Sequence, residues 1–246
     1  MRSVSYSPQF RHALLALCLS AFAPCFGQVV FLNEVDSDSN SVPDSTEFVE
    51  LYGAPNTPLD GHIVVFYKGG GSPVTSSVYA AFDLDGMSTD SAGFFLLANP
   101  EVAGADVVFE PGLLRDGGDA VALFEGDSID FPFATPLTTV GLLDAVVYGT
   151  GDQTNPFLID SLTPGQPQLD EWLYGSQNGG ALAWARLPDG GPAFGSDQMV
   201  LQQPTPGYTN LLDCDGGLIS AQGGENGTAQ ICVDLPGGFL PFTAES

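Results

Sequence analysis

Short apolar runs separated by turn-forming residues are the feature that most limits what this chain can fold into. Val, Phe and Tyr recur in these runs, and clusters of Gly, Pro, Asn and Asp stand between them. The 246 residues include 31 glycines and 19 prolines, and apolar residues at helical spacing are almost absent. This pattern is typical of an all-β sandwich or barrel.

The runs predict ten strands. Alternation is clearest in Thr46–Tyr52, where neighbouring side chains point to opposite faces. The expected strands are Val29–Val35, Thr46–Tyr52, Gly61–Tyr67, Ser77–Phe82, Gly93–Leu97, Asp106–Phe109, Ala120–Phe124, Leu142–Tyr148, Leu182–Arg186 and Met199–Gln202.

Two stretches depart from this pattern. Residues Gly149–Gly180 contain many turn formers and one short apolar patch, so we expect an extended surface loop with room for a single helical turn. Residues 213–246 contain two short apolar runs, and we expect either the start of a second small β module or a disordered tail.

The N-terminus has the pattern of a signal peptide. Arg2 and Arg11 precede the apolar run Ala13–Ala23, and the spacing favours cleavage before Gln28, which makes residues 1–27 the signal. Lipoprotein cleavage at Cys18 or Cys25 is an alternative. The apolar run is about half the ~20 residues that a spanning helix needs. We therefore expect a secreted or cell-surface protein without a transmembrane span.

The chain that follows the signal is strongly acidic. It has 30 acidic residues and three basic ones (Lys68, Arg115 and Arg186), a formal charge of −27. Binding to nucleic-acid phosphates needs clustered Lys and Arg, so this composition argues against a nucleic-acid partner. A surface of this charge attracts divalent cations.

Two cysteines, Cys214 and Cys232, remain after signal cleavage. In an exported chain they most simply form one disulfide, which would contribute roughly 3 kcal/mol for a loop of this size. Two cysteines without nearby histidines fall short of the four ligands of a structural zinc site.

Residues suited to catalysis are scarce. His62 is the single histidine after the signal, and the motifs of serine hydrolases, zinc proteases and phosphate-binding loops are absent. Glu47 and Glu50 are the best candidates for a glycosidase-like pair, yet on one strand they point to opposite faces. We therefore expect no enzymatic activity from these residues.

Calcium is the one cofactor that the acidic residues suggest. The stretch "DSDSNSVPD" alternates oxygen-bearing side chains, and "DLDGMSTD" places a glycine after two aspartates. Both resemble parts of oxygen-rich calcium loops, although the distal glutamate of an EF-hand is missing, and solvated turns remain the alternative. The candidate ligands are Asp36, Asp38, Asn40, Asp44, Asp83, Asp85 and Asp90.

Several segments, in order and at similar spacing, resemble the lamin tail domain of exported bacterial proteins. They are "FLNEVDSDSN…DSTEFVELYG", "LDGHIVVFYKGG", "LLRDGGDAVALFEGD", "LLDAVVYGTGD", "ALAWARLPDGG" and "PTPGYTN". The resemblance covers residues 28–212. The positions that match the family pattern at its start are Asn33, Glu34, Glu47 and Glu50.

The resemblance implies an immunoglobulin-like β-sandwich that acts as a non-catalytic structural or binding module for an extracellular ligand of unknown identity. An alternative is the N-terminal accessory region of a larger extracellular nuclease or phosphatase, whose catalytic domain would lie beyond residue 246. For ligand contact, the first aromatic candidates are Tyr148, Trp172, Trp184 and Tyr208.

Overall fold

The computed structural model describes residues 30–38, 44–151, 154–171 and 182–210, and the backbone of two strands between residues 229 and 244. Features of the sequence that lie outside the described residues are the signal peptide, Asn40, Trp172 and Cys214. For Cys232 the structure describes only the backbone, so the expected disulfide remains a prediction.

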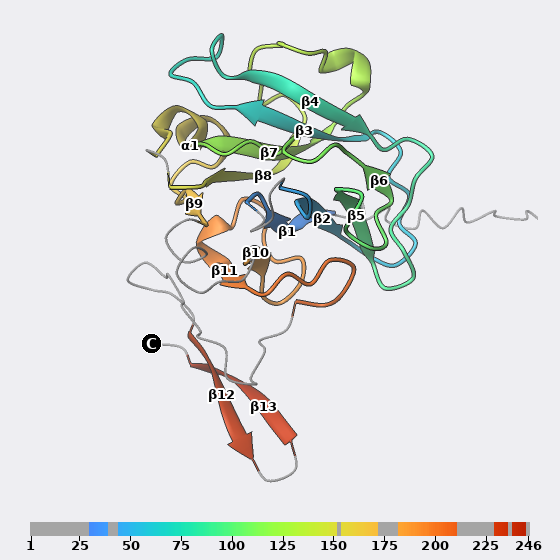
Figure 1. Cartoon of the computed structure of the whole chain (residues 1–246), viewed down its shortest axis with the longest axis vertical. Coiled ribbons are helices and arrows are strands. Elements are labelled where there is room, and N and C mark those ends of the chain that lie inside the picture. Colours follow the sequence, from blue (N-terminus) through green and yellow to red (C-terminus); the bar gives the residue numbers. More distant parts are fainter. Residues whose placement is uncertain are drawn as a thin grey trace, which may run out of the picture.

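Two β-sheets form the body of the protein (Figure 1). The first has the strand order β11 (Met199–Gln202), β10 (Ala183–Arg186), β1 (Phe31–Asp36), β2 (Phe48–Tyr52), β5 (Phe94–Ala98) and β6 (Val107–Val108). The second has the order β4 (Ser77–Asp83), β3 (His62–Lys68), β7 (Asp119–Glu125), β8 (Leu142–Gly149) and β9 (Leu169–Asp170). Neighbouring strands are antiparallel, except for the parallel pairs β5–β6 and β8–β9.

Little else in the described chain is regular. The helical elements are α1 (Pro156–Leu162), η1 (Ser128–Asp130) and η2 (Ser196–Gln198), and none of the described helices is long or apolar enough to cross a membrane. Strands β12 (Ala229–Leu235) and β13 (Gly238–Ala244) pair with each other as an antiparallel hairpin. The all-β prediction is confirmed, and each of the ten expected strands is present with ends that differ by at most two residues.

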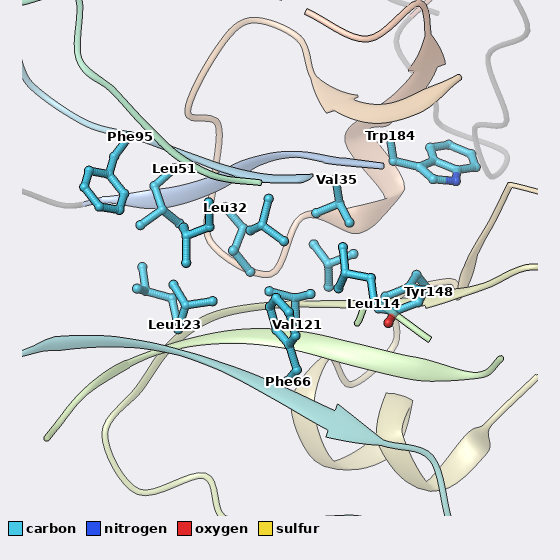
Figure 2. Close-up of a cluster of buried hydrophobic side chains, with 14 of the residues drawn as sticks. Leu32, Val35, Leu51, Phe66, Phe95, Leu114, Val121, Leu123, Tyr148 and Trp184 are labelled. Carbon is cyan, nitrogen blue, oxygen red and sulfur yellow. The ribbon is translucent and has the colours of Figure 1, made fainter. Parts of the chain in front are cut away.

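The main core lies between the two sheets. Leu32, Leu51 and Phe95 of the first sheet face Phe66 and Val121 of the second (Figure 2), and all five side chains are at most 2% exposed. Burying a side chain of this size contributes roughly 1.5–3 kcal/mol relative to leaving it in water. The sandwich therefore depends on the inward-facing residues of each alternating run.

Strand β3 is buried on both faces. Val65 and Tyr67 point away from the main core, where Phe131 and the α1 residues Leu158 and Leu162 cover them. The unbroken apolar run of this strand follows from that double burial.

A bulge in β1 changes which of its residues face the core. The register between β1 and β2 shifts between Leu32 and Glu34, which leaves Asn33 as an extra residue. Leu32 and Val35 are therefore both in the core, although residues three apart on a regular strand point to opposite faces. The same shift aims the side chain of Asn33 at neighbouring loops.

The expectation of an extended surface loop at residues 149–180 needs correction for its described part. Asn155 caps α1 through its side chain, and α1 has seven residues instead of a single turn. Leu158 and Leu162 pack into the apolar cluster that contains Val65 and Tyr67, outside the main core. Leu169 pairs with Tyr148 as part of β9. The apolar residues of this stretch are too sparse for a helical pattern to be visible in the sequence. Burial of Leu158, Leu162 and Leu169 fixes the segment against the sheet.

The core assignment predicts a contrast between two phenylalanines. Phe66 is fully buried, with the rings of Tyr79, Phe82 and Phe109 within 6 Å of its own. Phe66→Ala should lower the free energy of unfolding by about 3–5 kcal/mol. Phe133→Ala, at a side chain that is 79% exposed, should change it by less than about 0.5 kcal/mol. Urea denaturation of both variants tests this, and equal losses would contradict the assigned core.

Candidate functional site formed by two buried carboxylate clusters

Glu34 and Glu50 occupy opposite positions on the adjacent strands β1 and β2, and both side chains are fully buried. Like charges placed directly opposite each other destabilise a sheet, and burial adds to the cost. Two such glutamates need hydrogen-bond donors, and the segment around residues 205–210 supplies them.

Each glutamate accepts hydrogen bonds from this segment. Thr205 donates to Glu34 through its backbone N–H (2.9 Å) and its hydroxyl (2.8 Å). The backbone N–H of Gly207 donates to Glu50 at 2.6 Å, and the Nδ2 of Asn33 donates to the other oxygen at 2.8 Å. Both carboxyl groups therefore hold a segment that lies more than 150 residues later in the chain.

The turn at Thr205–Tyr208 follows from its local sequence. The N–H of Tyr208 donates to the carbonyl of Thr205, and Gly207 has a φ of 80°. Proline at the second position and glycine at the third, with positive φ, are the signature of a type II turn. A side chain at Gly207 would be strained, and the N–H of this residue is the one that reaches Glu50.

Two asparagines complete this group of residues, which we call the closing network. Asn33 accepts from the N–H of Gly190 (2.9 Å) and donates to Asp189 (3.0 Å). Asn210 donates through its backbone N–H to Asp189 (3.0 Å) and through Nδ2 to the carbonyl of Arg186 (3.2 Å). The members of the closing network are Asn33, Glu34, Glu50, Asp189, Thr205, Gly207 and Asn210.

Burial raises the pKa of both glutamates, to about 7 for Glu34 and about 8 for Glu50. The hydrogen bonds from Thr205 and Gly207 oppose this change and do not cancel it. Glu50 therefore keeps its proton near neutral pH.

A second group lies where β1 ends. Asp36 is 1% exposed, and Glu171, which directly follows β9, is 3% exposed. The N–H of Ser37 donates to both carboxyl oxygens of Glu171 at 3.2 Å. Burial raises the pKa of Asp36 and of Glu171 well above the usual range; the charge of Asp44 adds to the effect on Asp36, and the charge of Asp36 adds to the effect on Glu171.

Three more aspartates gather beside this buried pair. One carboxyl oxygen each of Asp38, Asp44 and Asp116 lies within 4.8 Å of the others, although Asp116 comes from the loop between β6 and β7. Burial, and then the charge of Asp116, raises the pKa of Asp38. We call the five residues Asp36, Asp38, Asp44, Asp116 and Glu171 the acidic loop cluster.

Glu47 lies beside this cluster. One of its oxygens accepts from the N–H of Gly112 at 2.8 Å, while the other is buried with no hydrogen-bond partner. Burial, followed by the charge of Asp44, raises the pKa of Glu47 to about 8. Glu47, directly before β2, and Glu50, within it, thus bond to different segments.

The second predicted calcium stretch forms a smaller, exposed group. Asp83 and Asp85 come together with Asp127, again with oxygens within 4.8 Å of one another. Asp83 accepts backbone N–H groups of Asp85 and Ser128. These hydrogen bonds lower the pKa of Asp83.

Asp90 has a separate position and role. One of its oxygens accepts the backbone N–H groups of Ala92, Gly93 and Phe94, which closes the turn before β5.

The other candidates have ordinary structural positions. His62 is half-buried, with its Nδ1 3.3 Å from the carbonyl oxygen of Asp60. Tyr148 and Trp184 lie in the main core, whereas Tyr208 is 75% exposed.

Asp116 and Glu171 are the site residues that the sequence pattern did not reveal. Asp116 follows Arg115 and Glu171 follows Asp170, and both lie far along the chain from the stretch around Asp36. Only the pairing of β8 with β9 and the path of the β6–β7 loop bring them to that stretch. Among the predicted ligands, Asp38 and Asp44 lie together with Asp116, and Asp83 and Asp85 lie together with Asp127.

Comparisons of the chain with protein-family models, with curated proteins and with solved structures found no match. The two clusters themselves are the basis for a functional assignment.

The closing network predicts an unusual pH dependence. The pKa of Glu50 is about 8 in the folded protein and 4.5, the ordinary value, in the unfolded chain. Between these two pH values the folded protein therefore keeps a proton that the unfolded chain has released. The resulting stabilisation is complete below pH 4.5 and is lost as the pH rises through about 8. At 1.36 kcal/mol per unit of pKa difference, we expect a loss of roughly 5 kcal/mol from this group.

Glu50→Gln should flatten the fall in unfolding free energy between about pH 5 and pH 9, measured by urea denaturation. Glu110→Gln, at an exposed glutamate, should keep the slope of the unchanged protein. A Glu50→Gln profile parallel to that of the unchanged protein would show that Glu50 does not hold the proton.

Proposed function

We propose that this chain is an exported, non-catalytic β-sandwich module of the lamin tail type, with an immunoglobulin-like arrangement of its strands. It would act at the cell surface or outside the cell by binding through its surface. The closing network is the observation that most supports this proposal. The segments "NEV", "EFVEL" and "TPGYTN" suggested the family in the sequence, and in the structure they bond to one another.

The role of the glutamates also supports a module without catalytic activity. A general acid or base must come within hydrogen-bonding distance of a substrate. Glu34, Glu47 and Glu50 are fully buried, and each accepts a hydrogen bond from a distant loop. Such carboxyl groups position loops, and a substrate could reach them only if those loops moved away.

The charge of the surface limits the kind of partner. The exported chain has three basic residues, and Arg186 is buried beside Asp144. Polyanions such as nucleic acids would meet repulsion over most of the surface. Neutral or cationic extracellular partners fit the proposal.

An activity screen tests the absence of catalysis. We expect no turnover of chromogenic phosphodiesters, phosphomonoesters or glycosides by the exported chain, with or without divalent cations. Turnover that disappears in Glu47→Gln or Glu50→Gln, while the circular dichroism spectrum stays unchanged, would replace the proposal with a hydrolase.

A pair of neighbouring substitutions tests the closing network itself. Asn210 is 2% exposed, and its loss removes the side-chain donor to the carbonyl of Arg186 and one of the two acceptors of the Gln202 side chain. Asn210→Ala should therefore lower the free energy of unfolding by about 1–3 kcal/mol. Thr209→Ala, at the exposed residue next to it, should change it by less than about 0.5 kcal/mol in the same denaturation experiment. Equal effects would remove the main support for the proposal.

A further inference from the structure

We propose that Asp36, Asp38, Asp44, Asp116 and Glu171 form one calcium site that joins the end of β1 to two distant loops. This site is independent of the proposed function, because a module with or without calcium could bind a partner in the same way.

The spacing of the carboxyl oxygens fits a single ion. Calcium binds oxygen at about 2.3–2.6 Å, so two oxygens on one ion lie at most about 5 Å apart. The oxygens of Asp38, Asp44 and Asp116 meet this condition, since all lie within 4.8 Å of one another. Calcium takes six to eight oxygens, and the neighbouring carboxyl groups offer further ones.

A buried carboxyl oxygen without a partner is the second, independent observation. The Oδ1 of Asp36 is buried and has no hydrogen-bond partner, and the hydroxyl of Ser37 beside it is in the same state. Among the charges that act on Asp36, that of Asp44 is the strongest, and Asp36 and Asp38 are the charges that act on Glu171. The charges of the buried pair and of Asp38 and Asp44 therefore act on one another, and in the proposed site a calcium ion gives the unpartnered oxygen of Asp36 a partner.

The basic residues that the structure describes have other partners or positions. After the signal, the sequence contains three basic residues. Arg186 forms an ion pair with Asp144, Arg115 lies over the ring of Tyr79 at 4.5 Å, and Lys68 is exposed at the end of β3. Because an uncompensated buried carboxylate is costly, either protons or an external cation must neutralise the cluster.

The donor set favours calcium among the external cations. All of the groups are oxygens, which excludes the sulfur and imidazole ligands that zinc usually takes. The ligands come from separate loops with unequal burial, which suits the flexible coordination of calcium better than the regular octahedron of magnesium. Extracellular modules commonly bind calcium at about 10⁻⁴–10⁻³ M, and we expect an affinity in this range.

The group of Asp83, Asp85 and Asp127 serves as a comparison within the same molecule. It has similar oxygen spacing, but Asp85 and Asp127 are exposed and the oxygens already accept backbone N–H groups. We assign no ion to this group, and it supplies the control variant.

Calorimetric titration and thermal unfolding of the full mature chain test the site. After EGTA treatment and dialysis, we expect calcium chloride to bind with one ion per chain. At calcium about 100 times the dissociation constant, the unfolding temperature should rise by about 5–10 °C and return with EGTA. Equal concentrations of magnesium should give a smaller rise. No binding heat and no rise at 10 mM calcium would overturn the proposal.

Variants at partly exposed ligands locate the ion without threatening the fold. Asp38→Asn and Asp116→Asn should each weaken calcium binding at least tenfold, whereas Asp127→Asn should leave it unchanged. Binding that persists in the Asp38→Asn/Asp116→Asn double variant, or that is lost in Asp127→Asn, would place the ion elsewhere and overturn the assignment.

The variant Asp36→Asn tests whether a bound cation or a proton neutralises the carboxyl group of Asp36. With a calcium site, this variant should unfold at an unchanged or higher temperature in EGTA and gain less from calcium than the unchanged protein does. An equal calcium-induced rise in both proteins would show that Asp36 is not a ligand.

Discussion

The ion pair between Arg186 and Asp144 connects the two sheets, and the rest of the buried polar structure depends on it. Arg186 of β10 donates to Asp144 of β8 at 2.8 Å, and both side chains are almost fully buried. The same guanidinium also donates to the carbonyls of Leu32 and Pro192, while Asp144 accepts the N–H groups of Leu32, Ala145 and Phe194. A buried pair offsets its loss of hydration only when its remaining donors and acceptors are bonded in this way.

Arg186 is the one buried basic residue in the described part of this acidic chain, and the other buried carboxyl groups discussed above do not pair with it. With the arginine bonded to Asp144, Glu34 and Glu50 receive backbone and side-chain donors instead of a counter-charge, and burial raises their pKa values. In the acidic loop cluster, the buried Oδ1 of Asp36 has no hydrogen-bond partner. An external cation is the remaining way to neutralise that cluster without adding protons.

The alternation of apolar and polar residues was sufficient to predict the strands. It marks the face that a strand can bury, whichever strand lies beside it. The turn at Thr205–Tyr208 was equally local, since its proline and glycine impose the backbone angles. The helix α1 escaped prediction because only two of its residues, Leu158 and Leu162, are fully buried. Among the site residues, Asp38 and Asp44 stand close together in the sequence, and their proximity in space followed from that.

The sequence by itself determined an all-β chain with a large excess of acidic over basic residues. It could not determine which carboxyl groups meet, because strand pairing joins residues that are far apart along the chain. The bulge at Asn33, the approach of the 205–210 segment to Glu34 and Glu50, and the meeting of Asp116 and Glu171 with the end of β1 were decided by tertiary structure. The physical reason is that alternation fixes only which face a side chain occupies, whereas packing of the two sheets fixes its neighbours.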